Sequence, residues 1–212
     1  MSDRLNDLSV RRLVERLATS DPVPGGGSAA ALAGAMGAAL AHMVVELTIG
    51  RPAAGEHAGQ LGEIGMTASS LQAELLNLAE LDAAAYDAVI RARRLPRASD
   101  REREARAVQV AAATRDATRI PLETARAAAA VLDLTEALAT IGNSHAISDV
   151  GVAAMLATTA LRGAALNVRI NLPHLPDDEP MRNDAEAELE RLLAGLDERD
   201  LRVRAAVAER MA

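Results

Sequence analysis

The sequence predicts an all-α fold, a helical bundle built around two long helices of small residues. Apolar residues recur at spacings of three and four through most of the chain, and no segment alternates with the two-residue period of a strand. Phe and Trp are absent and Tyr86 is the single tyrosine, so the core must consist of Leu, Val, Ile, Met and Ala. A chain of 212 residues is predicted to form a single domain, 1–212.

The first half of the chain predicts three helices. Residues Leu5–Ala18 form a short amphipathic pattern, and Pro22–Gly50 reads as a glycine-rich loop followed by a long Ala-rich helix. Ser28 is predicted to be the N-cap of that helix, because a serine hydroxyl satisfies an unpaired backbone N–H there. A long helix is predicted from about Ala58 to Arg94.

The second half predicts further helices separated by breakers. Residues Arg101–Arg119 are helical, and Pro121 either kinks this helix or begins the next one, which runs to about Thr140. Ile147–Ile170 is the second helix of small residues, and Asp184–Met211 is a charged amphipathic helix. The two small-residue helices are expected to be close neighbours, within one subunit or across a dimer interface.

Composition excludes several classes of function. The net charge of −7 argues against nucleic-acid binding. The absence of cysteine excludes disulfides, a thiol nucleophile and a thiolate metal site. Every basic side chain is Arg, so a Schiff-base lysine and a P-loop lysine are excluded too.

The predicted location is the cytoplasm. The N-terminus is charged throughout and has no apolar segment of the kind found in signal peptides. The Ala-rich helix has the length of a membrane span, but Ala and Gly contribute little insertion energy, and His42 and Glu46 interrupt it. We therefore expect no membrane partner.

The loop Gly25, Gly26, Gly27, Ser28 is a candidate binding element. Glycines permit positive φ angles and a close approach of ligand to backbone. The N–H groups and dipole at the start of the following helix favour an anion such as a carboxylate or phosphate. The alternative is a flexible loop before a closely packed helix, since no Lys-Ser/Thr follows as in a Walker motif.

Asp82 is the sharpest catalytic candidate. It shares one helix face with Leu71, Leu75 and Leu78 and therefore interrupts an apolar stripe. A buried carboxylate is costly unless it is paired or protonated, so the alternatives are a salt bridge to Arg and a functional role as a base or an anion beside a cationic intermediate. Tyr86, one turn later, either packs in the core or contacts a ligand.

Asp149 is a second candidate near the start of a helix, where its alternative role is capping, worth about 1 kcal/mol. Asn143 precedes it, and Asn167 follows it by five helical turns on the same side. At ~1.5 Å per residue, Asp149 and Asn167 are ~27 Å apart, too far to touch one small reactive centre in the same chain. They would serve an elongated ligand, two symmetry-related sites, or the interface alone.

A metal site is not predicted. His42 and Glu46 lie four residues apart on one helix face, which is a possible arrangement of two ligands. No second pair of this kind supports it, and the other histidines, at 57, 145 and 174, show no ligand spacing.

Four segments resemble one known family. They are residues 24–50 (PGGGSAAALAGAMGAALAHMVVELTIG), 78–89 (LAELDAAAYDAV), 119–134 (RIPLETARAAAAVLDL) and 142–172 (GNSHAISDVGVAAMLATTALRGAALNVRINL). The chain from about residue 5 to 205 resembles the C-terminal domain family of formiminotransferase-cyclodeaminase, which includes free-standing bacterial methenyltetrahydrofolate cyclohydrolases. The resemblance implies an all-helical dimer with a folate site near the subunit interface.

The resemblance also implies site residues and a reaction. Its motif positions correspond here to Gly25, Gly26, Gly27, Ser28, Asp82, Asn143, Asp149 and Asn167. Asp82 and Asp149 would be the catalytic carboxylates, and the others, with Tyr86, would bind a tetrahydrofolate derivative as substrate, with no separate cofactor. The expected reaction is hydrolysis of 5,10-methenyltetrahydrofolate; the alternatives are cyclodeamination of formiminotetrahydrofolate and a non-catalytic helical dimer.

Overall fold

The computed structural model describes residues 4–212, which form helices and loops with no strand among them. The elements in chain order are η1 (Leu5–Asp7), α1 (Val10–Leu17), α2 (Gly26–Thr48), η2 (Pro52–His57), α3 (Ala58–Arg93), α4 (Asp100–Ile141), η3 (Ser144–Ala146), α5 (Ile147–Asn171), η4 (Leu172–His174), α6 (Met181–Leu193) and α7 (Leu196–Met211), where η denotes a short 3₁₀ helix. The predicted all-α class is confirmed.

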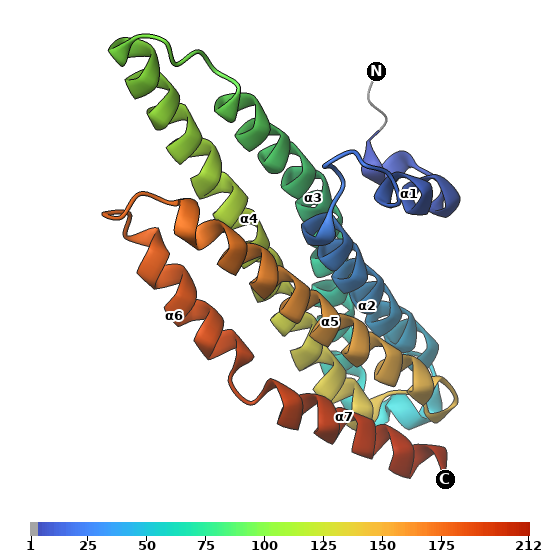
Figure 1. Cartoon of the computed structure of the whole chain (residues 1–212). Coiled ribbons are helices and arrows are strands. Elements are labelled where there is room, and N and C mark those ends of the chain that lie inside the picture. The colour runs from blue at the N-terminus through green and yellow to red at the C-terminus, as the bar shows by residue number, and fades with distance from the viewer. Residues whose placement is uncertain (1–3) are drawn as a thin grey trace.

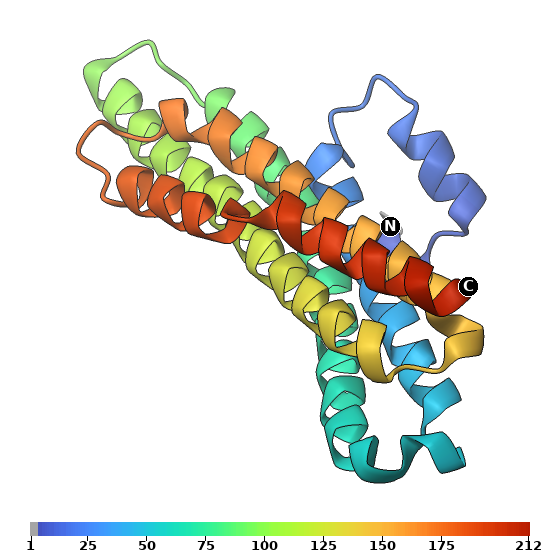
Figure 2. The same ribbon diagram turned by 90° about the horizontal axis from the view of Figure 1, so that it is seen from below.

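Four long helices form the body of the molecule (Figure 1). α2 packs against α3 and α5, and α4 packs against the same two helices from the other side. α6 and α7 follow one another along α4 and α5, while α1 lies apart at the side of the bundle (Figures 1 and 2). The end of the hairpin formed by α3 and α4 extends beyond the other helices (Figure 1).

The two small-residue helices, α2 and α5, are antiparallel neighbours within one subunit. A Cβ atom added to Gly37 would lie 3.0 Å from the Ala153 backbone oxygen, and one added to Gly163 would lie 3.0 Å from the Ala30 Cβ. Residues early in α2 therefore face residues late in α5. The predicted proximity is confirmed, and it places the N-terminus of α2 beside the C-terminus of α5.

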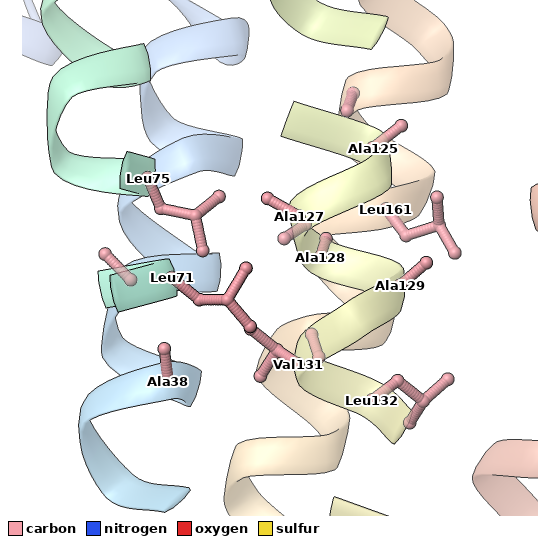
Figure 3. Close-up of a cluster of buried hydrophobic side chains, with 14 of the residues drawn as sticks. Ala38, Leu71, Leu75, Ala125, Ala127, Ala128, Ala129, Val131, Leu132 and Leu161 are labelled. Atoms are coloured by element: carbon pink, nitrogen blue, oxygen red, sulfur yellow. The ribbon is translucent and has the colours of Figure 1, made fainter. Parts of the chain in front are cut away.

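The core contains aliphatic side chains only, as the composition requires. Leu71 and Leu75 of α3 extend toward Val131 of α4, and Leu161 of α5 packs on the far side of α4 (Figure 3). Alanines fill the closest approaches between helices, where a larger side chain would hold the backbones apart.

Two predicted helices are each divided in two. The segment Leu5–Ala18 breaks into η1 and α1 because Ser9 caps α1, accepting a hydrogen bond from the Arg12 backbone N–H. The segment Asp184–Met211 breaks at Gly195, whose φ of 66° is left-handed. The apolar spacing continues across both breaks, so it did not reveal them.

Pro121 begins no new helix, because α4 runs through it without interruption. Proline removes one backbone hydrogen bond, and buried residues on either side, Thr118 and Leu122 among them, hold both halves of α4 against the bundle.

Within residues 4–212, two helical stretches are long and apolar enough to span a membrane, namely α2 and residues 144–174. Of the most apolar part of each, 56% and 50% respectively is buried in the bundle, as is usual for core helices.

Candidate active site

A cavity of about 260 Å³ opens where the start of α2, the middle of α3 and the end of α5 meet. α2 contributes its glycine-rich N-terminus, α3 contributes Asp82 and Tyr86, and α5 contributes Asn167 and Asn171. Pro22, Val23 and Gly25 from the preceding loop, Ala117 of α4 and Ile170 complete the wall. Six of the nine predicted site residues, Gly25, Gly26, Gly27, Asp82, Tyr86 and Asn167, line this one cavity, and a seventh, Ser28, contacts Asp82.

Asp82 is held by Ser28 rather than by an arginine. The Ser28 hydroxyl, which is buried, donates a hydrogen bond of 2.8 Å to Asp82 Oδ2. Burial raises the pKa of the Asp82 carboxyl above its usual value, and hydrogen bonds from the side chain and backbone of Ser28 partly oppose that rise. The salt bridge that the sequence left open is not among the interactions that shift this carboxyl's pKa.

The predicted role of Ser28 as an N-cap is wrong. Gly25 occupies the N-cap position, and Ser28 is the third residue of α2. Its hydroxyl therefore points to α3 and binds a carboxylate 54 residues further along the chain.

Gly27 is required by a close approach. A Cβ atom added to Gly27 would lie 2.1 Å from Asp82 Oδ1, well inside van der Waals contact. The positive φ angles that the sequence allowed for this loop do not occur, since the positive-φ glycines of the described residues are Gly50 and Gly195. The absence of a side chain at Gly27 lets the carboxylate lie against the first turn of α2.

Asn167 and Asn171 face the cavity from α5 with their side chains oriented by backbone carbonyls. The Asn167 Nδ2 donates to the Gly163 oxygen at 2.8 Å. The Asn171 Nδ2 donates to the oxygens of Ala117 and Asn167 at 2.7 and 2.9 Å. Both side-chain N–H groups of Asn171 are thus used, whereas Asn167 keeps one N–H as a donor, and both side-chain oxygens are available as acceptors. Asn171 was not among the predicted site residues, although its spacing of four from Asn167 was the available signal.

Tyr86 lies at the rim of the cavity and not in the core. It is 42% exposed, whereas Leu75 and Leu78 on the same helix face are buried. The alternative in which Tyr86 packs in the core is therefore wrong, and its contact with a ligand stays a prediction.

Asn143 and Asp149 lie at the opposite end of α5. Asn143 lines a second cavity, of about 330 Å³, and Asp149 is in the first turn of α5. Ala146 is the N-cap residue of α5, so Asp149 does not cap this helix. Because α5 is continuous from Ile147 to Asn171, the ~27 Å separation of Asp149 and Asn167 follows from the helical rise.

His42 and Glu46 form a contact of 3.6 Å on α2. Among the described residues, no group of three or more His, Cys, Asp or Glu side chains is placed to hold a metal ion.

Chemically, the first cavity combines one partly desolvated carboxylate, a hydroxyl bound to it, two amide oxygens and a tyrosine. A carboxylate whose pKa is raised by burial can accept and return a proton, and its charge can stabilise a cation. Sequence comparison places this arrangement among known proteins: the profile described as formiminotransferase-cyclodeaminase matches residues 9–191. The chain belongs to this family.

Curated relatives of this family include two kinds of enzyme. A methenyltetrahydrofolate cyclohydrolase from Methylorubrum extorquens is 42% identical over 88% of this chain and 89% of its own length. A formimidoyltransferase-cyclodeaminase from Mus musculus is 35% identical over 82% of this chain, which corresponds to only 32% of the mouse protein.

A solved structure supports the same assignment. The formiminotetrahydrofolate cyclodeaminase of Thermotoga maritima superposes with a TM-score of 0.86 and 26% sequence identity, covering 97% of this chain and 98% of that one. The helical arrangement is therefore shared along nearly the whole length of both chains.

Proposed function

We propose that this protein hydrolyses 5,10-methenyltetrahydrofolate to 10-formyltetrahydrofolate. The observation that carries the proposal is the placement of Asp82 in a cavity of about 260 Å³. This carboxylate is partly desolvated, is bound by Ser28 and lies against the glycine-rich turn. A curated relative that is 42% identical, and of which 89% is covered, is a methenyltetrahydrofolate cyclohydrolase.

Asp82 is the proton-transfer group of the proposed reaction. Its charge stabilises the delocalised cation of the N5–C–N10 bridge, and it accepts a proton as water adds to the bridging carbon. The resulting hydroxyl intermediate loses its O–H proton as the C–N5 bond breaks, and Asp82 returns a proton to N5. One proton is released overall, and the formyl group stays on N10.

The oxygens of Asn167 and Asn171 accept hydrogen bonds from the N–H groups of the pteridine ring in this proposal, and Tyr86 covers its face at the rim. No separate cofactor takes part. The sequence predictions of a cytoplasmic location and of no nucleic-acid or membrane partner are retained as part of the proposal.

Cyclodeamination is the second candidate reaction. The Thermotoga maritima structure bears that name, and the same carboxylate could protonate the departing ammonia as N10 closes onto the formimino carbon. Hydrolysis is preferred because the cyclohydrolase is 42% identical to this chain, whereas the mouse enzyme is 35% and the Thermotoga maritima cyclodeaminase 26% identical.

A dimer completes the proposal. One side of α2 presents Met36, Met43 and Leu47 to solvent, and α5 presents Val152, Met155, Leu166 and Ile170, so that an exposed apolar face joins the two cavities. A twofold axis perpendicular to α2 and α5 would cover this face and bring the Asp149 end of one subunit to the Asp82 end of the other. Asp149 would then act at the partner's site.

The test of the reaction is the loss of methenyltetrahydrofolate absorbance, corrected for spontaneous hydrolysis. We expect acceleration by the wild type and a loss of about 10²-fold or more in Asp82→Asn, as is typical when a general base is removed. No acceleration by the wild type rejects hydrolysis, and ammonia release from formiminotetrahydrofolate then tests the second reaction. If neither reaction is accelerated, the remaining hypothesis is a non-catalytic helical dimer.

Subunit mixing tests the composite site. Asp82→Asn and Asp149→Asn are each expected to be inactive alone, while a mixed dimer carries both substitutions in one site and neither in the other. Mixing and reassociating the two variants should therefore restore about a quarter of wild-type activity. Full activity of Asp149→Asn alone, or no recovery on mixing, would confine the site to one chain.

A further inference from the structure

The second cavity has a cationic and neutral polar lining. It lies where the end of α2, the end of α4 and the end of α7 meet, and Arg51, Arg210, His57 and His145 line it together with three hydroxyl side chains. No Asp or Glu is among its lining residues, although the chain as a whole carries a net charge of −7. This cavity is therefore a local site of positive charge on an acidic protein.

The positive charge of Arg51 is not neutralised by a carboxylate in the described ion pairs. Its contact is a long hydrogen bond, 3.4 Å, from Nη1 to the side-chain oxygen of Asn143. Most arginines of the described chain that form side-chain contacts lie against an Asp or Glu, such as Arg126 against Glu188. Arg51 can thus accept an anionic ligand without giving up an ion pair.

Arg210 is fixed at the cavity wall by the C-terminus of α4. It donates to the backbone oxygens of Ala139, at 2.9 Å, and of Gly142. A guanidinium has five N–H groups, so donors remain after these two bonds.

A buried asparagine makes the site rigid. Asn143 is 8% exposed; its backbone N–H donates to Thr48 Oγ1 at 3.0 Å and its Nδ2 to the Leu47 oxygen at 3.1 Å. Its side-chain oxygen accepts from the His145 backbone N–H at 3.0 Å as well as from Arg51. The end of α2 and the turn before α5 are thereby tied together beside the two arginines.

The first cavity has the opposite character. Its lining includes Asp82 and no Arg, Lys or His, so it offers no cation to the glutamate carboxylates of a folate. Its volume of about 260 Å³ is also below the ~300–1,000 Å³ of cavities that enclose a whole small-molecule ligand. The glutamyl end of the substrate must therefore lie outside it.

We propose that the second cavity binds the glutamate carboxylates of a folate whose pteridine ring occupies the first cavity of the partner subunit. Arg51 is the principal specificity residue, and Arg210 assists it. The proposal rests on the function and dimer proposed above, because within one chain the two cavities are separated by the length of α5, ~27 Å from Asp149 to Asn167.

The first experiment separates binding of the tail from catalysis. We compare three substrates: methenyltetrahydrofolate with one glutamate, methenyltetrahydrofolate with several glutamates, and the analogue that lacks glutamate. Each is assayed with the wild type, Arg51→Gln and the control Arg202→Gln. Arg202 is an exposed arginine of α7 that faces Glu136. Arg51→Gln should raise KM for the glutamylated substrates by about tenfold with kcat unchanged, as for the loss of one charge-assisted hydrogen bond. The analogue without glutamate should show no such change.

Several results would overturn the proposal. Among them are an unchanged KM in Arg51→Gln and an equal rise in KM for the analogue that lacks glutamate. An equal rise in Arg202→Gln would indicate only an effect of bulk charge. A rise in KM with Arg93→Gln but not with Arg51→Gln would move the tail to the exposed end of α3 and also overturn it. If the wild type hydrolyses none of the substrates, the proposed function is wrong. The proposed binding of the glutamate tail is then tested by the binding measurement alone.

Binding is measured by calorimetry with p-aminobenzoyl-triglutamate, which carries the tail without the pteridine. We expect binding that Arg51→Gln weakens by about tenfold. If inorganic phosphate binds as tightly and with the same dependence on Arg51, the cavity is a general anion site and the tail assignment is wrong.

A mixed dimer tests action across the interface. When Asp82→Asn chains are in excess, nearly every Arg51→Gln chain is in a mixed dimer. The active site of that dimer takes its Asp82 from the Arg51→Gln chain. The second cavity that faces this site belongs to the Asp82→Asn chain and retains Arg51. We expect the KM of the wild type. The raised KM of Arg51→Gln in that dimer would show that Arg51 acts within its own chain and would overturn the proposal.

Discussion

The Ser28 hydroxyl donates a 2.8 Å hydrogen bond to Asp82 Oδ2, which joins the first turn of α2 to the middle of α3. Asp82 lines the first cavity and Ser28 is buried, and the absence of a side chain at Gly27 lets the carboxylate lie against the first turn of α2. The bond holds the carboxylate in one orientation and opposes the rise of its pKa that burial causes. Function and stability can therefore both be tested at this pair.

Ser28→Ala should move the pH dependence of activity. The hydrogen bonds from Ser28 lower the Asp82 pKa against the effect of burial, so removing the hydroxyl raises that pKa further. A base is active when ionised, and hence the acid limb of the kcat/KM profile should shift to higher pH. Ser70→Ala, which removes an exposed hydroxyl on the same helix, is the control. An acid limb that stays in place in Ser28→Ala would contradict this assignment of the base.

Asp82→Asn should be more stable than the wild type at neutral pH. The folded-state pKa of Asp82 is raised by burial, so the ionised form is disfavoured in the folded state. The stability contributed by protonated Asp82 is fully present below the pKa of the unfolded state, about 3.9. It is lost as the pH rises through the pKa of the folded state. The stability advantage of Asp82→Asn in urea unfolding should accordingly shrink as the pH is lowered. If the stability advantage of Asp82→Asn grew as the pH was lowered, the pKa of Asp82 would be lowered and not raised in the folded protein.

Gly27→Ala should abolish activity while the protein remains folded. The new Cβ would lie 2.1 Å from Asp82 Oδ1, and the carboxylate must move to make room. Displacing a general base is expected to cost about 10²-fold or more in kcat. Gly59→Ala on α3, where a Cβ meets nothing within 4 Å, is the matched control and should keep wild-type kcat. Normal kcat in Gly27→Ala would show that Asp82 need not lie against this turn.

Gly37→Ala should destabilise the contact between α2 and α5. Its Cβ would be 3.0 Å from the Ala153 backbone oxygen, and a backbone atom cannot rotate away as a flexible side chain can. We expect a loss of about 1–3 kcal/mol in the free energy of unfolding. Gly62→Ala in the open part of α3 should instead gain about 0.5–1 kcal/mol from helix propensity. Urea unfolding of the two variants measures both, and equal stabilities would show that α2 and α5 can move apart freely.

Periodicity predicted which segments are helical and was less informative about where they end. The spacing of apolar residues defines a helix face whatever the neighbours are, and α2, α3 and α5 agree with it closely. Short-range breaks were missed at Ser9 and at Gly195, because apolar spacing continues across both. Pro121 was ambiguous for the opposite reason, since burial of the surrounding helix outweighs one lost hydrogen bond.

The sequence predicted which residues belong to the candidate site but not how they are arranged in space. Asp82 stood out because a carboxylate interrupted an apolar stripe, and that signal was local. The sequence partly predicted that the nine residues lie at two ends of the molecule. Asp149 and Asn167 are on one helix and are too far apart to share a small site. The pairing of Arg51 with Arg210 gave no signal, because the two residues are 159 positions apart in the sequence and only the fold brings them to one cavity.

The sequence by itself determined an aliphatic, Ala-rich helical chain with a glycine turn and an isolated carboxylate, since those properties depend on composition and on spacings of three and four residues. Only the tertiary structure decided that Ser28 binds Asp82 instead of capping its own helix, that Gly27 admits the carboxylate, and that a cationic cavity lies at the far end of α5. The physical reason is that these contacts join residues distant in sequence, and their geometry is set by how closely small residues allow α2, α3 and α5 to pack.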